Sequence, residues 1–188
     1  GAGGAGRLVA RTDDDDRNLA WTPDGRGLLA LSNYGAPGAE TRIFRRTAEG
    51  TWSSPARWRK PACLPTWSPD GTVAACAELS GRLLLLGPRG DSLRTLVDNG
   101  LIPDLAQFPQ WSSDGLTVYY LGVDSVSTSI FAVPMSGGRP RLAVRFDDPT
   151  RPWHRYGFRV FHDRFYFTIG DRESHIWVGE VGSRGGAK

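Results

Sequence analysis

The chain has 188 residues, of which 23% are charged, and a formal net charge of +3 at pH 7. A chain of this length can bury a substantial hydrophobic core in one domain, and no apolar run approaches the roughly 20 residues of a membrane-spanning helix. The 20 acidic residues nearly balance the 23 basic ones, and no aromatic stacking pattern accompanies the basic cluster within residues 42–60, so we expect no nucleic-acid binding.

The first predicted element is a short strand within residues 1–12. Its glycine-rich turn and the strand that follows, residues 3–11, match residues 137–145 position for position. In the repeat units of this chain, residues 137–145 form a last strand. We therefore expect residues 1–12 to form the outer strand of a preceding or closing unit.

A five-residue phrase then recurs three times, and its Asp residues are 46 and 44 positions apart. A fixed period in this range is typical of propeller arrays of small sheets. The Asp-Gly pair predicts a tight turn between two strands, because Gly takes a positive φ without strain and Asp bonds its own downstream backbone. The copies are Trp21-Thr22-Pro23-Asp24-Gly25, Trp67-Ser68-Pro69-Asp70-Gly71 and Trp111-Ser112-Ser113-Asp114-Gly115.

A second element follows each copy, with two polar or small residues before two large apolar ones. It occurs at residues 41–44, 81–84, 128–131 and 174–177. With the glycine turns, these segments predict an all-β chain of four-stranded antiparallel blades. We expect the blades near residues 17–60, 61–99, 106–146 and 156–181, which together with residues 1–12 form one domain over 1–181, and a flexible tail over 182–188.

With this phrase at this spacing, the chain resembles the TolB-like propellers, which are built from WD-like repeats, over about residues 3–181. Residues 165–178 are also similar to the closing blade of propellers appended to bacterial serine/threonine kinases and related regulators. His175 departs from that pattern, which usually carries an acidic residue there. The resemblance implies a ring of six blades of which this chain forms four; a closed four-bladed ring is the alternative.

Two cysteines, Cys63 and Cys76, flank the second turn. If Trp67 pairs with Thr72, Cys63 faces Cys76 directly, as a cross-strand disulfide requires. Two buried thiols are the alternative. The compartment stays open, because the TolB resemblance favours the periplasm whereas the kinase-propeller resemblance fits either side of the membrane.

We expect no catalytic residues, no metal and no cofactor in this chain. A catalytic triad needs a nucleophile, a base and an orienting carboxylate in contact, and no Gly-x-Ser-x-Gly elbow is present. The three histidines, His154, His162 and His175, all fall in the last predicted blade, whereas a metal site on the axis would draw ligands from several blades. The three repeat tryptophans are expected to pack between blades.

The loops indicate where a partner would bind. From the Asp of each turn to the apolar pair of the third strand, the spacing is 19, 13 and 16 positions, so one face of the array is variable while the other is stereotyped. Binding residues concentrate on loops held by a rigid scaffold. The predicted binding residues on the variable face are Tyr34, Trp153, His154 and Arg155.

These features predict a non-catalytic module that binds a protein or a small ligand. We expect it to be the C-terminal interaction or sensory part of a larger bacterial signalling or envelope protein, in contact with neighbouring domains of the same polypeptide. The alternative is an accessory propeller that gates a serine hydrolase or peptidase domain outside this chain.

Overall fold

Every regular element in the described part of the chain is a β-strand, and no helix occurs within it. The computed structural model describes residues 16–33, 36–59, 61–78, 80–98, 109–124, 127–146, 155–161 and 164–169. The predicted strand within residues 1–12, the apolar pair at 174–177 and the tail at 182–188 lie outside these ranges. The predicted domain boundaries therefore stay a prediction.

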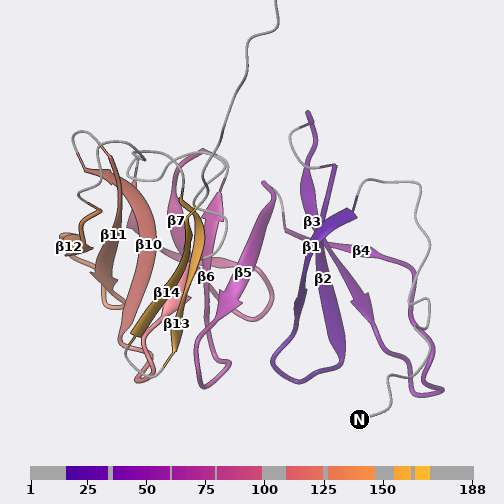
Figure 1. Ribbon diagram of the computed structural model, residues 1–188. Helices are drawn as coiled ribbons and strands as arrows, with labels where there is room; N and C mark the ends of the chain where they lie inside the picture. Colours follow the sequence, from indigo (N-terminus) through magenta and orange to yellow (C-terminus); the bar gives the residue numbers. More distant parts are fainter. Residues whose placement is uncertain are drawn as a thin grey trace, which may run out of the picture.

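The strands form three four-stranded antiparallel sheets and one two-stranded hairpin, each in simple up-and-down order (Figure 1). The first sheet contains β1 (Asp16–Trp21), β2 (Gly27–Ser32), β3 (Glu40–Arg45) and β4 (Ala56–Arg59). The second contains β5 (Cys63–Trp67), β6 (Ala74–Glu78), β7 (Leu83–Leu86) and β8 (Ser92–Val97). The third contains β9 (Gln110–Trp111), β10 (Thr117–Asp124), β11 (Ser127–Pro134) and β12 (Arg141–Val144), and the hairpin contains β13 (Arg155–Phe161) and β14 (Arg164–Ile169).

The first strands of successive sheets lie against one another. Strand β5 contacts β1, and β9 contacts both β5 and β13. The sheets therefore fan out from a common line of first strands, with β4, β8 and β12 on the outside (Figure 1). This arrangement confirms the predicted all-β class and the blade-like order of the strands.

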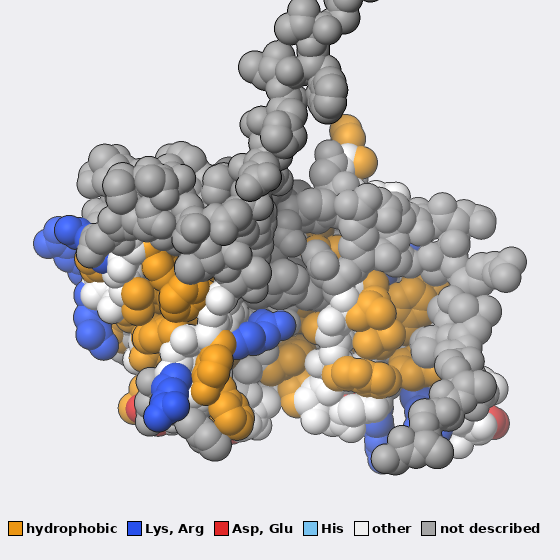
Figure 2. All heavy atoms as spheres, viewed as in Figure 1, with side chains coloured by type: hydrophobic (Ala, Val, Ile, Leu, Met, Phe, Trp, Pro, Cys, Tyr) orange, Lys and Arg blue, Asp and Glu red, His pale blue; other side chains and the backbone are white. Residues whose placement is uncertain are grey.

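Two of the core clusters lie between adjacent sheets, and the middle strands β2 and β7 are covered on both faces. All six residues of β2 and all four leucines of β7 are buried. Strands that are covered on both faces have near-continuous apolar sequences instead of alternating ones. The outer strand β12, in contrast, has mostly exposed side chains. Around the β13–β14 hairpin, Figure 2 shows hydrophobic side chains at the surface. In this hairpin, Phe161, Tyr166 and Phe167 are exposed.

The register of the second hairpin differs from the prediction by two residues. Trp67 pairs with Ala74 and not with Thr72. The turn is longer than a four-residue turn because the Ser68 backbone N–H donates to the Val73 carbonyl over 2.9 Å and closes a six-residue loop. A shift of two keeps the same side chains on each face of the sheet.

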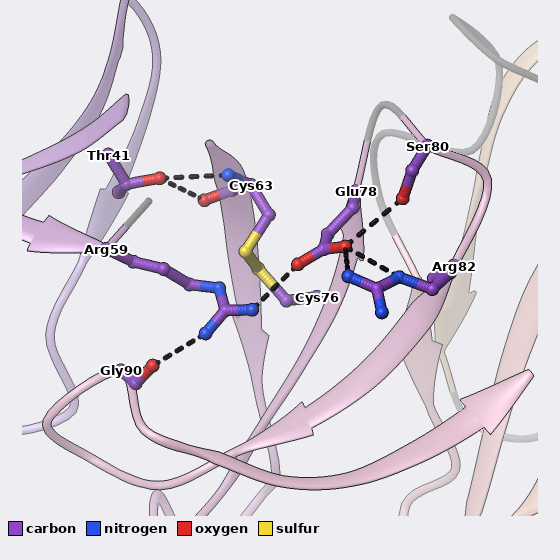
Figure 3. Close-up of a disulfide and its surroundings, with 8 residues drawn as sticks. All are labelled: Thr41, Arg59, Cys63, Cys76, Glu78, Ser80, Arg82 and Gly90. Atoms are coloured by element: carbon purple, nitrogen blue, oxygen red, sulfur yellow. Dashed lines mark hydrogen bonds and ion pairs between the residues drawn. A yellow bond between two sulfur atoms is a disulfide. The ribbon is translucent and has the colours of Figure 1, made fainter. Parts of the chain in front are cut away.

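Cys63 and Cys76 are joined by a disulfide, with their Cα atoms 5.7 Å apart (Figure 3). They do not face each other directly, since Cys76 pairs with Pro65 and Cys63 pairs with Glu78. The bond therefore runs diagonally across β5 and β6. Of the two states left open by the sequence, the structure has the disulfide.

Candidate functional site

The three Asp-Gly turns share one hydrogen-bond pattern. In each, the Asp Oδ1 atom accepts from the hydroxyl two residues before it and from the backbone N–H two residues after it. The hydroxyl donors are Thr22 at 2.5 Å, Ser68 at 2.5 Å and Ser112 at 2.6 Å. The backbone donors are Arg26 at 3.0 Å, Thr72 at 3.1 Å and Leu116 at 2.9 Å.

These contacts fix the charge of the turns. The hydroxyl hydrogen bond, followed by the backbone one, lowers the pKa of Asp24, Asp70 and Asp114 below the usual value of 3.8. All three carboxylates are therefore ionised at neutral pH. The turns lie on one face of the array and give that face a row of fixed negative charges.

Successive turns also touch one another through a proline and a glycine. A Cβ placed on Gly71 would lie 2.6 Å from the Pro23 Cβ, and one placed on Gly115 would lie 3.4 Å from the Pro69 Cδ. Both glycines have positive φ, as does Gly25, whose added Cβ would meet nothing within 4 Å. Each proline thus packs on the glycine of the next turn.

A pocket of about 510 Å³ opens between the second and third turns. Its polar side contains two carboxylates and several hydroxyls, whereas its apolar side contains proline and aliphatic side chains. The lining residues are Ser68, Pro69, Asp70, Thr72, Val73, Ser113, Asp114, Gly115, Leu116 and Met135. The pocket was not predicted from the sequence, although the 44-residue spacing of two Asp-Gly phrases was a signal for it.

The three repeat tryptophans have unlike surroundings. The Trp111 indole is buried, and its Nε1 donates to the Thr66 carbonyl of the preceding sheet over 2.7 Å. The Trp67 ring meets Trp58 of the first sheet edge-on, with 6.3 Å between ring centroids. Trp21 is 56% exposed, so the prediction that it packs between blades is wrong. No sheet precedes β1 within the described residues to cover it.

A buried ion cluster joins the first sheet to the second beside the disulfide (Figure 3). The Glu78 side chain is 1% exposed and accepts from Arg59 Nη2 over 2.7 Å and from Arg82 Nη2 over 2.6 Å. Arg59, at the end of β4, also donates to the Gly90 carbonyl over 2.9 Å. Burial alone would raise the pKa of Glu78, but the two arginines outweigh it and hold that pKa below its usual value.

A second polar contact crosses the same boundary. The Thr41 hydroxyl donates to the Cys63 carbonyl over 2.5 Å and accepts from the Cys63 backbone N–H over 3.0 Å. Thr41 is fully buried in β3. Buried polar groups stabilise a fold only when they are paired, so these contacts fix the relative position of the two sheets.

The structure leaves the predicted binding residues largely undescribed. Tyr34, Trp153 and His154 lie outside the described residues, and so do His162 and His175. Arg155 begins β13, but its side chain is not among those described. The binding-site prediction therefore stays a prediction. In the described part of the chain, no three His, Cys, Asp or Glu side chains are grouped so as to hold a metal ion.

No protein-family model matches the chain, and no curated protein matches its sequence. Solved structures do. A putative TolB from Agrobacterium tumefaciens aligns with a TM-score of 0.65 and 22% identity, over 87% of this chain and 57% of that one. The described part of the chain has the β-propeller fold of this putative TolB. The chain spans little more than half the length of this first neighbour, so its place in a six-bladed ring stays a prediction.

Other solved structures share the β-propeller fold at lower similarity. A TolB from Acinetobacter baumannii aligns with a TM-score of 0.51 and 12% identity, over 80% of this chain and 39% of that one. The C-terminal WD40 domain of Sif2 aligns with a TM-score of 0.51 and 15% identity, over 87% and 43%. A nidogen/laminin complex aligns with a TM-score of 0.52 and 14% identity, over 83% and 72%. The described part of the propeller holds no helix able to cross a lipid bilayer.

Proposed function

We propose that this propeller is a non-catalytic binding module whose partner contacts the irregular face of the array. The observation that carries the proposal is the contrast between the two faces. The connections between second and third strands span residues 33–39, 79–82 and 125–126, which are seven, four and two residues. The Asp-Gly turns instead repeat one hydrogen-bond pattern. A rigid scaffold with individual loops on one side is typical of a binding protein.

Tyr34, Trp153, His154 and Arg155 are the proposed contact residues on this irregular face. Aromatic and arginine side chains dominate the energetics of protein interfaces. The nidogen/laminin complex shows that a protein with a related fold has been solved in a protein complex. A protein partner is therefore the occupant that we favour.

The wider role is part of the same proposal. We infer that the module is the C-terminal interaction or sensory part of a larger bacterial signalling or envelope protein. The disulfide between Cys63 and Cys76 supports an oxidising compartment such as the periplasm, since disulfides are rare in the cytosol.

The test is a capture experiment from bacterial envelope extract. The immobilised protein should retain a partner that the double variant Trp153→Ala/Arg155→Ala loses. Leu93→Ala is a matched control, because Leu93 is 53% exposed on the outer strand β8 and is not on the irregular face. Equal capture by the double variant and the unaltered protein would contradict the proposed contact residues.

A further inference from the structure

The pocket between the second and third Asp-Gly turns has the features of a binding site on the opposite face from the irregular loops. Its volume, about 510 Å³, lies within the range of small-molecule and side-chain pockets. It is bounded by two turns that the Pro69–Gly115 contact holds together. The pocket is therefore part of the rigid scaffold.

Among the described residues, no cation balances the charges in the pocket. Neither Asp70 nor Asp114 forms an ion pair with any described residue, and the lining contains no Lys, Arg or His. The first turn differs, because Arg26 and Arg45 lie near enough to Asp24 to lower its pKa by their charge. Nearby arginines thus partly compensate the charge of Asp24, whereas the equivalent carboxylates of Asp70 and Asp114 in the pocket have no such compensation among the described residues.

The carboxylates also retain free acceptor positions. Both described hydrogen bonds of Asp114 are made by Oδ1, which leaves its Oδ2 for a ligand. In Asp70, the Oδ2 atom accepts from the Thr72 hydroxyl over 2.9 Å and from no other residue that the structure describes. A carboxylate oxygen has more than one acceptor position, so a donor from outside the protein can be added at both residues.

The rest of the lining fits the stem of a long cationic side chain. Val73, Leu116 and Met135 supply aliphatic surface beside the two carboxylates, and Leu116 is 61% exposed. Lys and Arg side chains pack their methylene groups on apolar surface while the charged end meets polar partners. A bare metal ion would use the carboxylates but not this apolar wall.

We propose that this pocket binds an arginine or lysine side chain presented by a segment of a partner protein. Asp70 and Asp114 bind the charged end, and Leu116 and Met135 contact its methylene stem. This site lies on the opposite face from the irregular loops, so it can hold or fail independently of the function proposed above.

The test measures binding of a peptide labelled at its amino terminus, fluorescein-Gly-Ser-Leu-Arg-Ser-Gly-amide, to the full chain by fluorescence anisotropy. Its control is the same peptide with citrulline in place of arginine, which keeps the shape and removes the charge. We expect the citrulline peptide to bind about fivefold more weakly, since it lacks the charge that the Asp70 and Asp114 carboxylates attract. No binding of the arginine peptide, or equal binding of both peptides, would overturn the proposal.

Matched variants locate the site. Asp70→Asn and Asp114→Asn keep the turn acceptor Oδ1 and remove the charge, and each should weaken binding of the arginine peptide. Asp24→Asn makes the same change in a turn outside the pocket and should leave binding unaltered.

Leu116→Lys places a tethered cation at an exposed position of the lining and should block the site even if an Asn variant folds poorly. Equal losses for Asp24→Asn and Asp70→Asn, or undiminished binding by Leu116→Lys, would contradict the assignment.

Discussion

Arg59 Nη2 lies 2.7 Å from Glu78 Oε1, across the boundary between the first and second sheets. Both side chains are largely buried, with 11% and 1% exposed. A buried carboxylate with two arginine partners is costly to break, because removing one charge leaves the others unpaired. This contact makes the first boundary the most sensitive to a change in charge among those described.

Glu78→Gln should lower the free energy of unfolding by about 3 kcal/mol. The reason is that Arg59 and Arg82 lose the charge that offsets their own. Urea denaturation measures the effect. The control is Glu40→Gln, whose two partners Arg42 and Arg57 are more exposed, at 23% and 66%, and which should cost less, about 1 kcal/mol. Equal costs for both variants would show that the buried cluster contributes no more than a surface pair.

Stability should fall in acid, and Glu78 should account for part of the fall. The folded-state pKa of Glu78 is lowered from its usual 4.5, so folding favours the ionised form. The resulting stability is fully present above the unfolded-state pKa and is lost as pH falls through the folded-state pKa. Melting temperatures from pH 7 to pH 3 should therefore decline below about pH 4.5. Glu78→Gln should decline less steeply, and an unchanged slope would contradict this role.

Gly71→Ala should destabilise the protein more than Gly25→Ala. Both residues have positive φ, which costs an L-residue about 1–2 kcal/mol. Only Gly71 meets a neighbour, because its added Cβ would lie 2.6 Å from Pro23 Cβ. Thermal unfolding of the two variants tests the difference. The double variant Pro23→Ala/Gly71→Ala should lose less than the sum of its single changes, and strict additivity would argue against the contact.

Trp111→Phe should cost more than Trp67→Phe by about 1 kcal/mol. Trp111 Nε1 donates to the Thr66 carbonyl, so phenylalanine leaves that carbonyl without its donor. Trp67 Nε1 is buried without a partner, so its removal forfeits no hydrogen bond. Chemical denaturation of both variants supplies the comparison. A larger loss for Trp67→Phe would mean that ring packing outweighs the indole hydrogen bond.

Reduction of the disulfide should lower the free energy of unfolding by about 2–4 kcal/mol. The bond joins residues 13 positions apart and restricts the unfolded chain. Denaturation midpoints with and without dithiothreitol measure this loss. The double variant Cys63→Ala/Cys76→Ala should be insensitive to the reductant, which separates the disulfide from other effects. An unaltered midpoint for the unmodified protein in reductant would contradict the prediction.

The periodic phrase made most of the fold predictable. Each Asp-Gly pair lies in the turn between the first two strands of a sheet, because the turn chemistry is local and repeats with the sequence. The register at Trp67 was missed because the Ser68 hydroxyl and backbone together close a longer loop. The exposure of Trp21 was missed for another reason, since burial there depends on a neighbouring sheet and not on local sequence.

The pocket could be inferred only in part. The sequence shows that Asp70 and Asp114 occupy equivalent turns, but their joining into one cavity depends on how closely two sheets approach. That approach is set by packing of Pro69 on Gly115 and by the Trp111 hydrogen bond. The spacing of the repeat does not show which of these distant residues will be in contact.

The succession of proline–glycine contacts ends at the third turn, where Ser113 replaces the proline. The third turn therefore lacks the proline ring that the first two turns place on the next glycine, although Tyr119 of β10 still meets Phe165 of β14 with 5.0 Å between ring centroids. In hydrogen–deuterium exchange, we expect the amides of β13 and β14 to exchange before those of β6 and β7. The array would then open one sheet at a time from its C-terminal side, with the disulfide-bonded sheet among the last to lose protection.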